Sequence, residues 1–283
     1  MRKLTKPTDN SGDVFIECIE IVRNANLKSR LTATRDLINT AATELESKVT
    51  TGELHTIIRE NVVNGNVTSK ELADVYTFRM SKPGTPGRKI YDKLKMAAPY
   101  GICPLCSHRI VTTIDHYLPK TEYPRLSVVP INLIPSCSDC NKSKLANYPT
   151  APEEEMLHPY YDDIENDLWL QATVSHSTPP AIQFKVAPDD DWGELLSDRV
   201  KFHFDSLELN ALYSAQAAVE LVQINYRLQM LHAALGAVGV RNHLLEGAET
   251  RSHANINSWQ AAMYRAMAAD QWFCDRGFKL SVD

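Results

Sequence analysis

The stretch that decides the fold is residues 103–144, CPLCSHRIVTTIDHYLPKTEYPRLSVVPINLIPSCSDCNKSK. It opens with Cys103-Pro-Leu-Cys106 and ends just after Cys137-Ser-Asp-Cys140, a second pair of cysteines with the same two-residue gap. Such a gap lets a tight turn direct two sulfurs at one ion, and two such turns complete a tetrahedral zinc shell. Four thiolates saturate the ion, so we predict a structural Zn²⁺ that stabilises the fold and takes no part in chemistry.

The residues between and after the cysteine pairs include groups that this zinc does not need. Asp115-His116 ends a short β-prone run that begins at Thr112, and Asn132 lies shortly before the second pair. Asn141 directly follows that pair, where a helix could start. These side chains are therefore available for a second site. Taken singly, each has a plainer explanation: a surface Asp-His pair or a satisfied core histidine, a turn asparagine, and a solvated helix face.

In their order along the chain, the elements from about Tyr100 to Lys144 resemble the HNH family of nucleases: Asp-His, Asn-Leu, then Cys-x-x-Cys-Asn-x-x-Lys. The resemblance implies an α+β protein with a central ββα-metal HNH core, flanked here by N- and C-terminal helical regions. In that core two strands and a helix surround a catalytic metal. Many members have histidine where this chain has Asn141. Asparagine also occurs there, and its amide oxygen can bind a hard cation.

The resemblance implies catalytic roles for His116, Asp115, Asn132 and Asn141. Hydrolysis of a phosphodiester needs an activated water and stabilisation of the charge that develops on the phosphoryl oxygens. His116 can accept the proton of that water, because an imidazole titrates near neutral pH. Asp115 and Asn141 offer oxygen ligands that suit Mg²⁺ or Mn²⁺. By analogy with the family, Asn132 fixes the loop that bears His116 through backbone hydrogen bonds.

The distribution of charge favours a nucleic-acid contact near these residues, although the net charge of the chain is −5. Residues 86–149 contain nine Lys/Arg against four Asp/Glu, whereas residues 150–200 contain two against twelve. A local basic patch can bind phosphate even on an acidic chain. We expect Lys142 and Lys144 to contact phosphate, and Lys120 and Arg125 to extend the basic track.

Three regions are predicted along the chain: an N-terminal helical region (1–85), the HNH core with its zinc site (86–165), and a strand pair followed by helices (166–283). The spacing of apolar residues predicts helices over Asp13–Asn24, Leu31–Val49, Ser69–Tyr76, Lys89–Met96, Leu207–Leu235 and Ser258–Phe273. Alternating apolar residues predict strands over Leu168–Val174 and Ala181–Ala187. We interpret the apolar side of the longest helix, with Leu209, Leu212, Ala215, Val219, Val222 and Tyr226, as core packing.

The resemblance implies a metal-dependent endonuclease that acts on nucleic acid, and we favour DNA. Proteins with an HNH core and large helical flanks resemble the nuclease subunits of bacterial anti-phage systems, notably the ATPase-paired Septu type. The alternative is a zinc-stabilised nucleic-acid-binding or adaptor module without catalysis, which would not require Asp115, His116 and Asn141 together. The aromatic-rich C-terminal helices suit self-association or a protein partner such as an ATPase, although a helical cap packed on its own chain explains them nearly as well.

Membrane insertion is not expected, because the chain has no apolar stretch of the roughly 20 residues that a spanning helix needs. The segment Met1–Gly12 is polar and does not have the apolar centre of a secretion signal. We therefore expect a cytoplasmic protein, in which paired cysteines bind metal rather than form disulfides.

Overall fold

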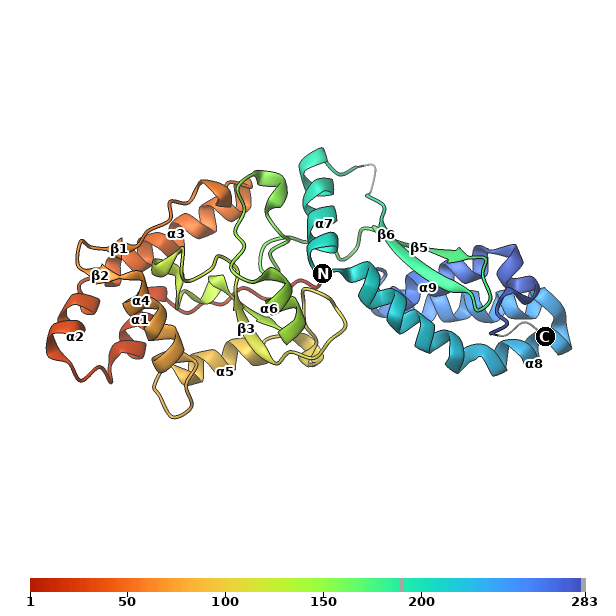
Figure 1. The fold of residues 1–283 in the computed structure, drawn as a ribbon, viewed down its shortest axis with the longest axis horizontal. Coiled ribbons are helices and arrows are strands. Elements are labelled where there is room, and N and C mark those ends of the chain that lie inside the picture. Colours follow the sequence, from red (N-terminus) through yellow and green to blue (C-terminus); the bar gives the residue numbers. More distant parts are fainter. Residues whose placement is uncertain (189–190, 281–283) are drawn as a thin grey trace. The chain divides into compact units, whose positions relative to one another are not determined.

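Two compact units, Met1–Asp163 and Ile164–Asp283, make up the chain in the computed structural model (Figure 1). The structure describes residues 1–188 and 191–280, so residues 189–190 and 281–283 of the predicted C-terminal region lie outside the described residues. Each unit combines helices with small antiparallel sheets, which confirms a mixed helix-and-sheet protein. The first unit contains both the predicted N-terminal helical region and the cysteine-rich centre.

The first unit begins with three helices: α1 (Ser11–Ile19), α2 (Ala25–Thr32) and α3 (Arg35–Thr51). The predicted helix Asp13–Asn24 is too long at its C-terminal end, because the side chain of Asn24 accepts a hydrogen bond from the backbone of Leu27 and caps α2. Asparagine is a preferred N-cap residue and a poor interior one. The predicted helix Leu31–Val49 is likewise divided, since α2 ends before Thr34 and α3 begins after it.

A short hairpin follows, where only helix was expected. Its strands are β1 (Val62–Val63) and β2 (Val67–Thr68), and they pair in antiparallel fashion. Between them Asn64 and Gly65 both have positive φ, 52° and 69°. An Asn-Gly dipeptide favours this tight turn, so the sequence did carry a signal for the hairpin.

Helix α4 (Ser69–Val75) lies where a helix was predicted, and Thr68 is its N-cap. The Thr68 hydroxyl accepts from the backbone of Glu71, and the Glu71 carboxylate accepts from the backbone of Thr68, which is a capping box. A π-helical turn, Tyr76–Met80, continues α4, and α5 (Arg88–Met96) lies where a helix was predicted.

The cysteine-rich centre contains strands β3 (Thr113–His116) and β4 (Leu133–Ser136), which pair antiparallel with Asp115 opposite Ile134 and His116 opposite Leu133. Helix α6 (Ser138–Lys144) follows β4 and packs against β3. It begins two residues before Cys140, because Cys137 serves as its N-cap. Helix α5 covers both strands, and every residue of β4 is buried.

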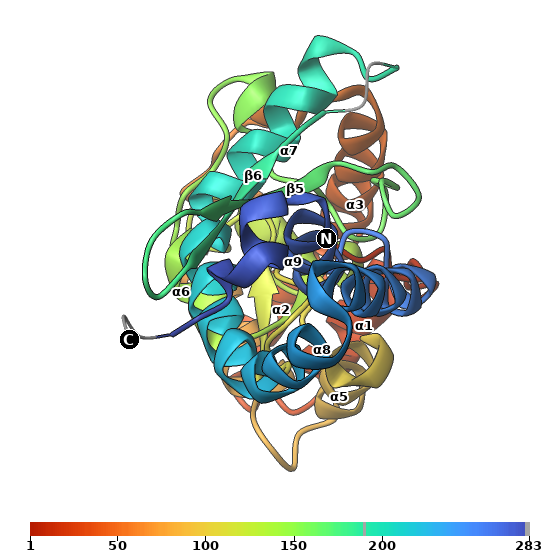
Figure 2. The same cartoon turned by 90° about the vertical axis from the view of Figure 1, so that its right-hand side faces the viewer.

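In the second unit, β5 (Leu170–Ser175) and β6 (Ala181–Val186) form the predicted antiparallel pair. Helix α7 (Glu194–Ser206) was not predicted; α8 (Leu209–Ala254) and α9 (Trp259–Ala269) follow it. Strand β5 packs on α9 and β6 on α8 (Figures 1 and 2). None of the helices within residues 1–188 and 191–280 is both long and apolar enough to cross a membrane.

Helix α8 is longer than predicted and is divided at Gly236, whose φ is 64°. The half after Gly236 returns along the half before it, since Arg251 contacts Glu220 at 3.3 Å. The interpretation of its apolar stripe as core is wrong for its middle and end: Val219, Val222 and Tyr226 are 53%, 63% and 73% exposed. The buried side of this half instead carries residues about four apart, namely Tyr213, Ala217, Leu221, Asn225 and Leu228.

Candidate functional site

The four cysteines of the two pairs converge on one point. All four are buried, and the Sγ atoms of Cys103, Cys106, Cys137 and Cys140 lie within 4.8 Å of one another. Zn–S bonds of about 2.3 Å place the sulfurs of a tetrahedral site about 3.8 Å apart, so this cluster needs little adjustment to hold the ion. The residues form a cluster that can bind a metal such as zinc, as the spacing of the pairs predicted.

Backbone amides support the sulfurs in both turns. The amide of Arg109 donates to Sγ of Cys106 at 3.4 Å, and the amide of Cys140 donates to Sγ of Cys137 at the same distance. A hydrogen bond to sulfur favours the thiolate, the form that binds metal. A hydrogen bond with Cys103 lowers the pKa of the Cys106 thiol. The side chains of Arg109 and Asp139 join the two turns through a 2.9 Å ion pair.

The end of β3 brings Asp115 and His116 to the face that α6 covers. Both residues are buried, with 4% and 7% exposure. Lys144, the last residue of α6, donates from Nζ to the backbone oxygen of His116 at 2.5 Å, and the same Nζ lies 3.4 Å from Oδ2 of Asp115. Burial raises the pKa of Asp115, whereas the positive charge of Lys144 opposes this rise. The structure therefore joins three of the predicted site residues.

The imidazole of His116 is held in one tautomer. Its Nε2 atom lies 2.9 Å from the backbone oxygen of Ser127. A carbonyl oxygen can only accept, so Nε2 carries the proton and Nδ1 carries the lone pair. Burial lowers the pKa of His116 to about 3, which keeps the ring neutral at physiological pH. A neutral imidazole with a fixed ring and a defined lone pair has the form that a general base requires.

Asn132 makes the backbone hydrogen bonds that the resemblance implied. Its Oδ1 accepts from the amide of Leu118 at 2.8 Å, and its Nδ2 donates to the backbone oxygens of Leu118 and Leu126 at 2.9 and 3.2 Å. The side chain is fully buried. These bonds fix both ends of the segment 118–126, which is separated from β3 only by Tyr117.

Three further predicted site residues, Asn141, Lys142 and Lys120, differ in burial and in the groups that they contact. Asn141 is half-buried on α6, one helical turn before Lys144, so the two lie on the same side of the helix. Lys142 is exposed. The Nζ atom of Lys120 lies 5.1 Å from the ring centroid of Tyr76, and burial lowers the pKa of Lys120. Lys120 is near enough to influence the pKa values of both Asp115 and His116.

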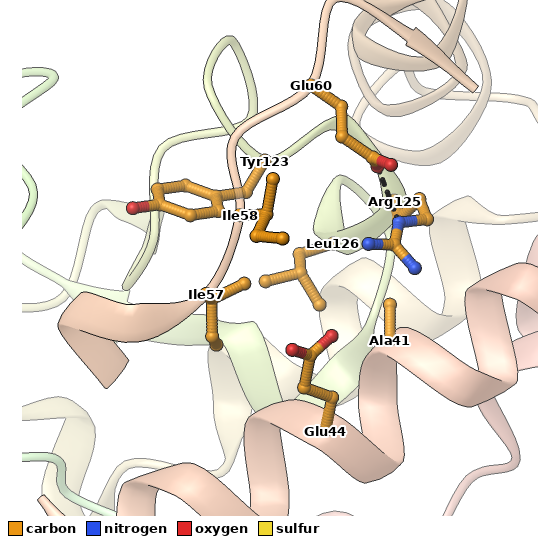
Figure 3. Close-up of a pocket in the computed structure, with 8 residues that line it drawn as sticks. All are labelled: Ala41, Glu44, Ile57, Ile58, Glu60, Tyr123, Arg125 and Leu126. Carbon is orange, nitrogen blue, oxygen red and sulfur yellow. Dashed lines mark hydrogen bonds and ion pairs between the residues drawn. The ribbon is translucent and has the colours of Figure 1, made fainter. Parts of the chain in front are cut away.

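Arg125, which was expected to extend the basic track, forms an ion pair within the first unit. Its Nε atom forms a 2.6 Å ion pair with Glu60, and its side chain is only 18% exposed. The pair borders a small pocket between α3 and the segments 57–60 and 123–126, with Ile57 and Leu126 among its apolar lining residues (Figure 3). The charge of Arg125 is thus already compensated inside the protein.

Two residues that contact His116 were not singled out from the sequence. Tyr76 packs edge-on against the His116 ring, and Ser127 supplies the oxygen that fixes its tautomer. Tyr76 lies forty residues earlier in the chain, and the Ser127 contact is made by the backbone, so neither leaves a local signal in the sequence.

His158, a residue that follows the HNH-like segment, is fully buried; its Nδ1 accepts from the Tyr160 amide at 3.3 Å, which suits a structural role in a turn.

Comparisons with known proteins add one relative. No family model matches the chain, and no solved structure matches it. The chain is similar to protein ea31 of Escherichia phage lambda, with 29% identity over 234 residues that cover 79% of each protein. The name of that protein states no activity, so the chemistry of this chain has to be argued from its own residues.

Proposed function

We propose that the chain is a metal-dependent HNH endonuclease that hydrolyses phosphodiester bonds of nucleic acid, with DNA as the favoured substrate. The observation that carries the proposal is the buried Asp115-His116 pair at the end of β3, with His116 held by Ser127 in the tautomer that leaves the lone pair on Nδ1. The order β3, β4, α6 beside a four-cysteine cluster supports it further, since the family core has two strands and a helix.

In the proposed mechanism, Nδ1 of His116 takes the proton of the attacking water while the Ser127 carbonyl keeps the ring oriented. Asn132 keeps the following loop in place through its three backbone hydrogen bonds. Lys142, exposed on α6, is suited to contact the phosphate backbone.

The carboxylate of Asp115 and the amide oxygen of Asn141 are the residues that would hold Mg²⁺ or Mn²⁺. They are hard oxygen donors, and Mg²⁺ commonly takes one or two protein ligands and completes its shell with water and phosphate oxygens. Such an ion would stabilise charge on the phosphoryl oxygens and make water more acidic. The low pKa of His116, about 3, makes the imidazole a weak base, so it would work best on water of that kind.

The experiment that tests the proposal is incubation of the purified full-length protein with plasmid DNA, linear DNA and RNA, each with Mg²⁺, with Mn²⁺ and with a chelator. We expect nicked or linear products that depend on the divalent ion and are lost in His116→Gln. Cleavage that persists in the chelator, or in His116→Gln, would contradict the proposed chemistry.

A second candidate is a zinc-stabilised nucleic-acid-binding or adaptor module without catalysis. The observation that favours it is Lys144, whose ammonium already neutralises Asp115 at 3.4 Å and so competes with a divalent ion. This candidate predicts that nucleic acid is bound equally well with and without Mg²⁺ or Mn²⁺ and is never cut.

We extend the proposal to a biological setting on the strength of the resemblance to anti-phage nucleases. It comprises a cytoplasmic location, a role in bacterial defence against phage, and a protein partner such as an ATPase or a second copy of the chain. Co-purification from cells, with and without phage infection, tests for such a partner.

A further inference from the structure

Lys144 is a buried cation in the candidate site. The residue is 7% exposed, and its Nζ atom contacts two oxygens, the backbone oxygen of His116 at 2.5 Å and Oδ2 of Asp115 at 3.4 Å. A buried ammonium is costly unless an opposite charge and hydrogen-bond acceptors surround it. The carboxylate of Asp115 offsets the free-energy cost of burying the Lys144 ammonium, and the ammonium offsets the cost of burying the carboxylate.

The same carboxylate is the proposed ligand of the divalent ion. An ion at Asp115 would meet the positive charge of Lys144 a few ångströms away, and that of Lys120, which also acts on Asp115. His116 is neutral and offsets neither charge. The ammonium and the ion therefore compete for one carboxylate.

Lys144 has a second hydrogen-bond acceptor, the backbone oxygen of His116, which it can keep when a divalent ion takes its place at Asp115. Its bond to the backbone oxygen of His116 is the shorter of the two contacts, 2.5 Å against 3.4 Å. Asn141 lies one turn earlier on the same side of α6, so an ion that took the place of Lys144 at Asp115 would approach the side of the helix that carries Asn141.

We propose that Lys144 is an internal counterion of Asp115, that Mg²⁺ or Mn²⁺ binds by displacing its ammonium from the carboxylate, and that Lys144 thereby sets the affinity of the site for the divalent ion. Lys144 is on this view a positioning residue rather than a phosphate contact. The inference rests on the proposed function in one respect, the assignment of Asp115 as the ligand of the ion.

The test uses the zinc-loaded full-length protein and measures Mn²⁺ binding by titration calorimetry and by the electron paramagnetic resonance signal of unbound Mn²⁺. Lys144→Met removes the charge and keeps the length of the side chain, and Lys144→Gln also keeps a donor for the His116 oxygen. Both should bind Mn²⁺ at least about tenfold more tightly than the unaltered protein, because a nearby like charge is removed. Lys144→Arg, which keeps the charge, and Lys142→Met, exposed on the same helix, should leave the affinity unchanged.

Thermal melting gives a second readout. Without Mn²⁺, Lys144→Gln should melt at a lower temperature, because Asp115 is left buried without its counterion, and added Mn²⁺ should raise that temperature by more than it does in the unaltered protein. Equal or weaker Mn²⁺ binding in folded Lys144→Gln would overturn the inference, and cleavage by the unaltered protein would then still support the nuclease. Tighter binding with no cleavage by any form would support the cation exchange and count against the nuclease.

Discussion

The ring of Tyr76 lies edge-on to the imidazole of His116, with centroids 4.3 Å apart and planes inclined by 71°. Tyr76 begins the π-helical turn after α4, so the N-terminal helices supply one wall of the candidate site. Its hydroxyl also donates to the backbone oxygen of Ile114, in β3, at 3.4 Å. Near the start of the chain, the amide of Arg2 donates at 2.8 Å to the oxygen of Pro104, between two cysteines of the metal cluster.

These contacts predict that the cysteine-rich centre does not work alone. A fragment of residues 86–163 keeps all four cysteines but loses Tyr76 and the amide of Arg2, and it exposes apolar surface that the N-terminal helices cover. We expect this fragment to aggregate or to lack cleavage activity, whereas the first unit, 1–163, should keep its zinc and its melting transition. Zinc analysis and circular dichroism of the two fragments check this. Full activity in 86–163 would show that the N-terminal helices are dispensable.

The metal cluster predicts one zinc per chain. Cys137→Ser should lose the ion and unfold or aggregate, because structural zinc supplies about 10–16 kcal/mol in small zinc-dependent folds. Cys274→Ala is the matched control, since Cys274 is also buried but lies in the second unit, outside the cluster. Zinc analysis of both variants by mass spectrometry decides. Well-folded, active protein without zinc would contradict the prediction.

Replacement of His116 tests catalysis separately from folding. His116→Gln can still donate to the Ser127 oxygen but has no basic nitrogen, so cleavage should fall by about 10²–10⁴-fold while zinc content stays the same. Because His116 is buried against Tyr76, we also expect a loss of stability of about 1–3 kcal/mol. His176→Ala is the control: its ring is half-exposed in the second unit and pairs with Asp270. Equal loss of cleavage in the two variants would argue against His116 as the base.

The low pKa of His116 predicts acid sensitivity. Its pKa is about 3 in the folded protein against 6.5 in the unfolded chain, so the unfolded state binds more protons between these values. Stability is therefore complete above pH 6.5 and is lost as pH falls toward 3, by about 2 kcal/mol near pH 5. The raised pKa of Asp115 acts in the opposite direction. The free energy of unfolding in urea is measured for the unaltered protein and for His116→Gln from about pH 8 to about pH 5, and the difference between the two isolates the contribution of the histidine. If this difference does not change with pH, the low pKa is wrongly assigned to His116.

The local features of the centre could be predicted from the sequence, because their determinants lie close together in the chain. The two cysteine pairs form one cluster, and a β-prone run ends in Asp115 and His116 as expected. The role of Lys144 could not be predicted in this way. A lysine that contacts phosphate at the surface and a lysine that is a buried counterion look the same in the sequence, and only the packing of α6 on β3 distinguishes them. The contact between Tyr76 and His116 is equally a product of tertiary packing.

In the second unit, the spacing of apolar residues was not enough to predict which side of a helix is buried or where every helix lies. The stripe of Val219, Val222 and Tyr226 has helical spacing and lies on a helix, but spacing identifies a common side and does not tell which side is covered. The return of α8 at Gly236 and the packing of β6 bury a different side. Helix α7 was not predicted, and the segment before its first turn is acidic and contains Gly193, which is typical of a loop.

The exposed side of α8 supports a prediction about assembly. Val219, Val222, Tyr226 and Met230 follow one another at intervals of three or four residues and are each at least half exposed. Stable monomers rarely leave such a continuous row of large apolar side chains in water, and Tyr is a favoured interface residue. The second unit carries nine Lys/Arg against fifteen Asp/Glu, so phosphate is a poor candidate for this surface. We therefore predict that this side of α8 associates with a second copy of the chain.

Two substitutions test the prediction. Val222→Glu and Tyr226→Glu place a charge in the row, and each should weaken the dimer by at least about 2 kcal/mol, or about thirtyfold in Kd. Gln183→Glu is the matched control, because Gln183 adds the same charge at an exposed position of β6, away from the row on α8. Sedimentation equilibrium and light scattering of the full-length chain measure the dissociation constant. A monomer at every concentration, or equal weakening by Gln183→Glu, would rule out this side as the contact, and the search would move to a partner protein.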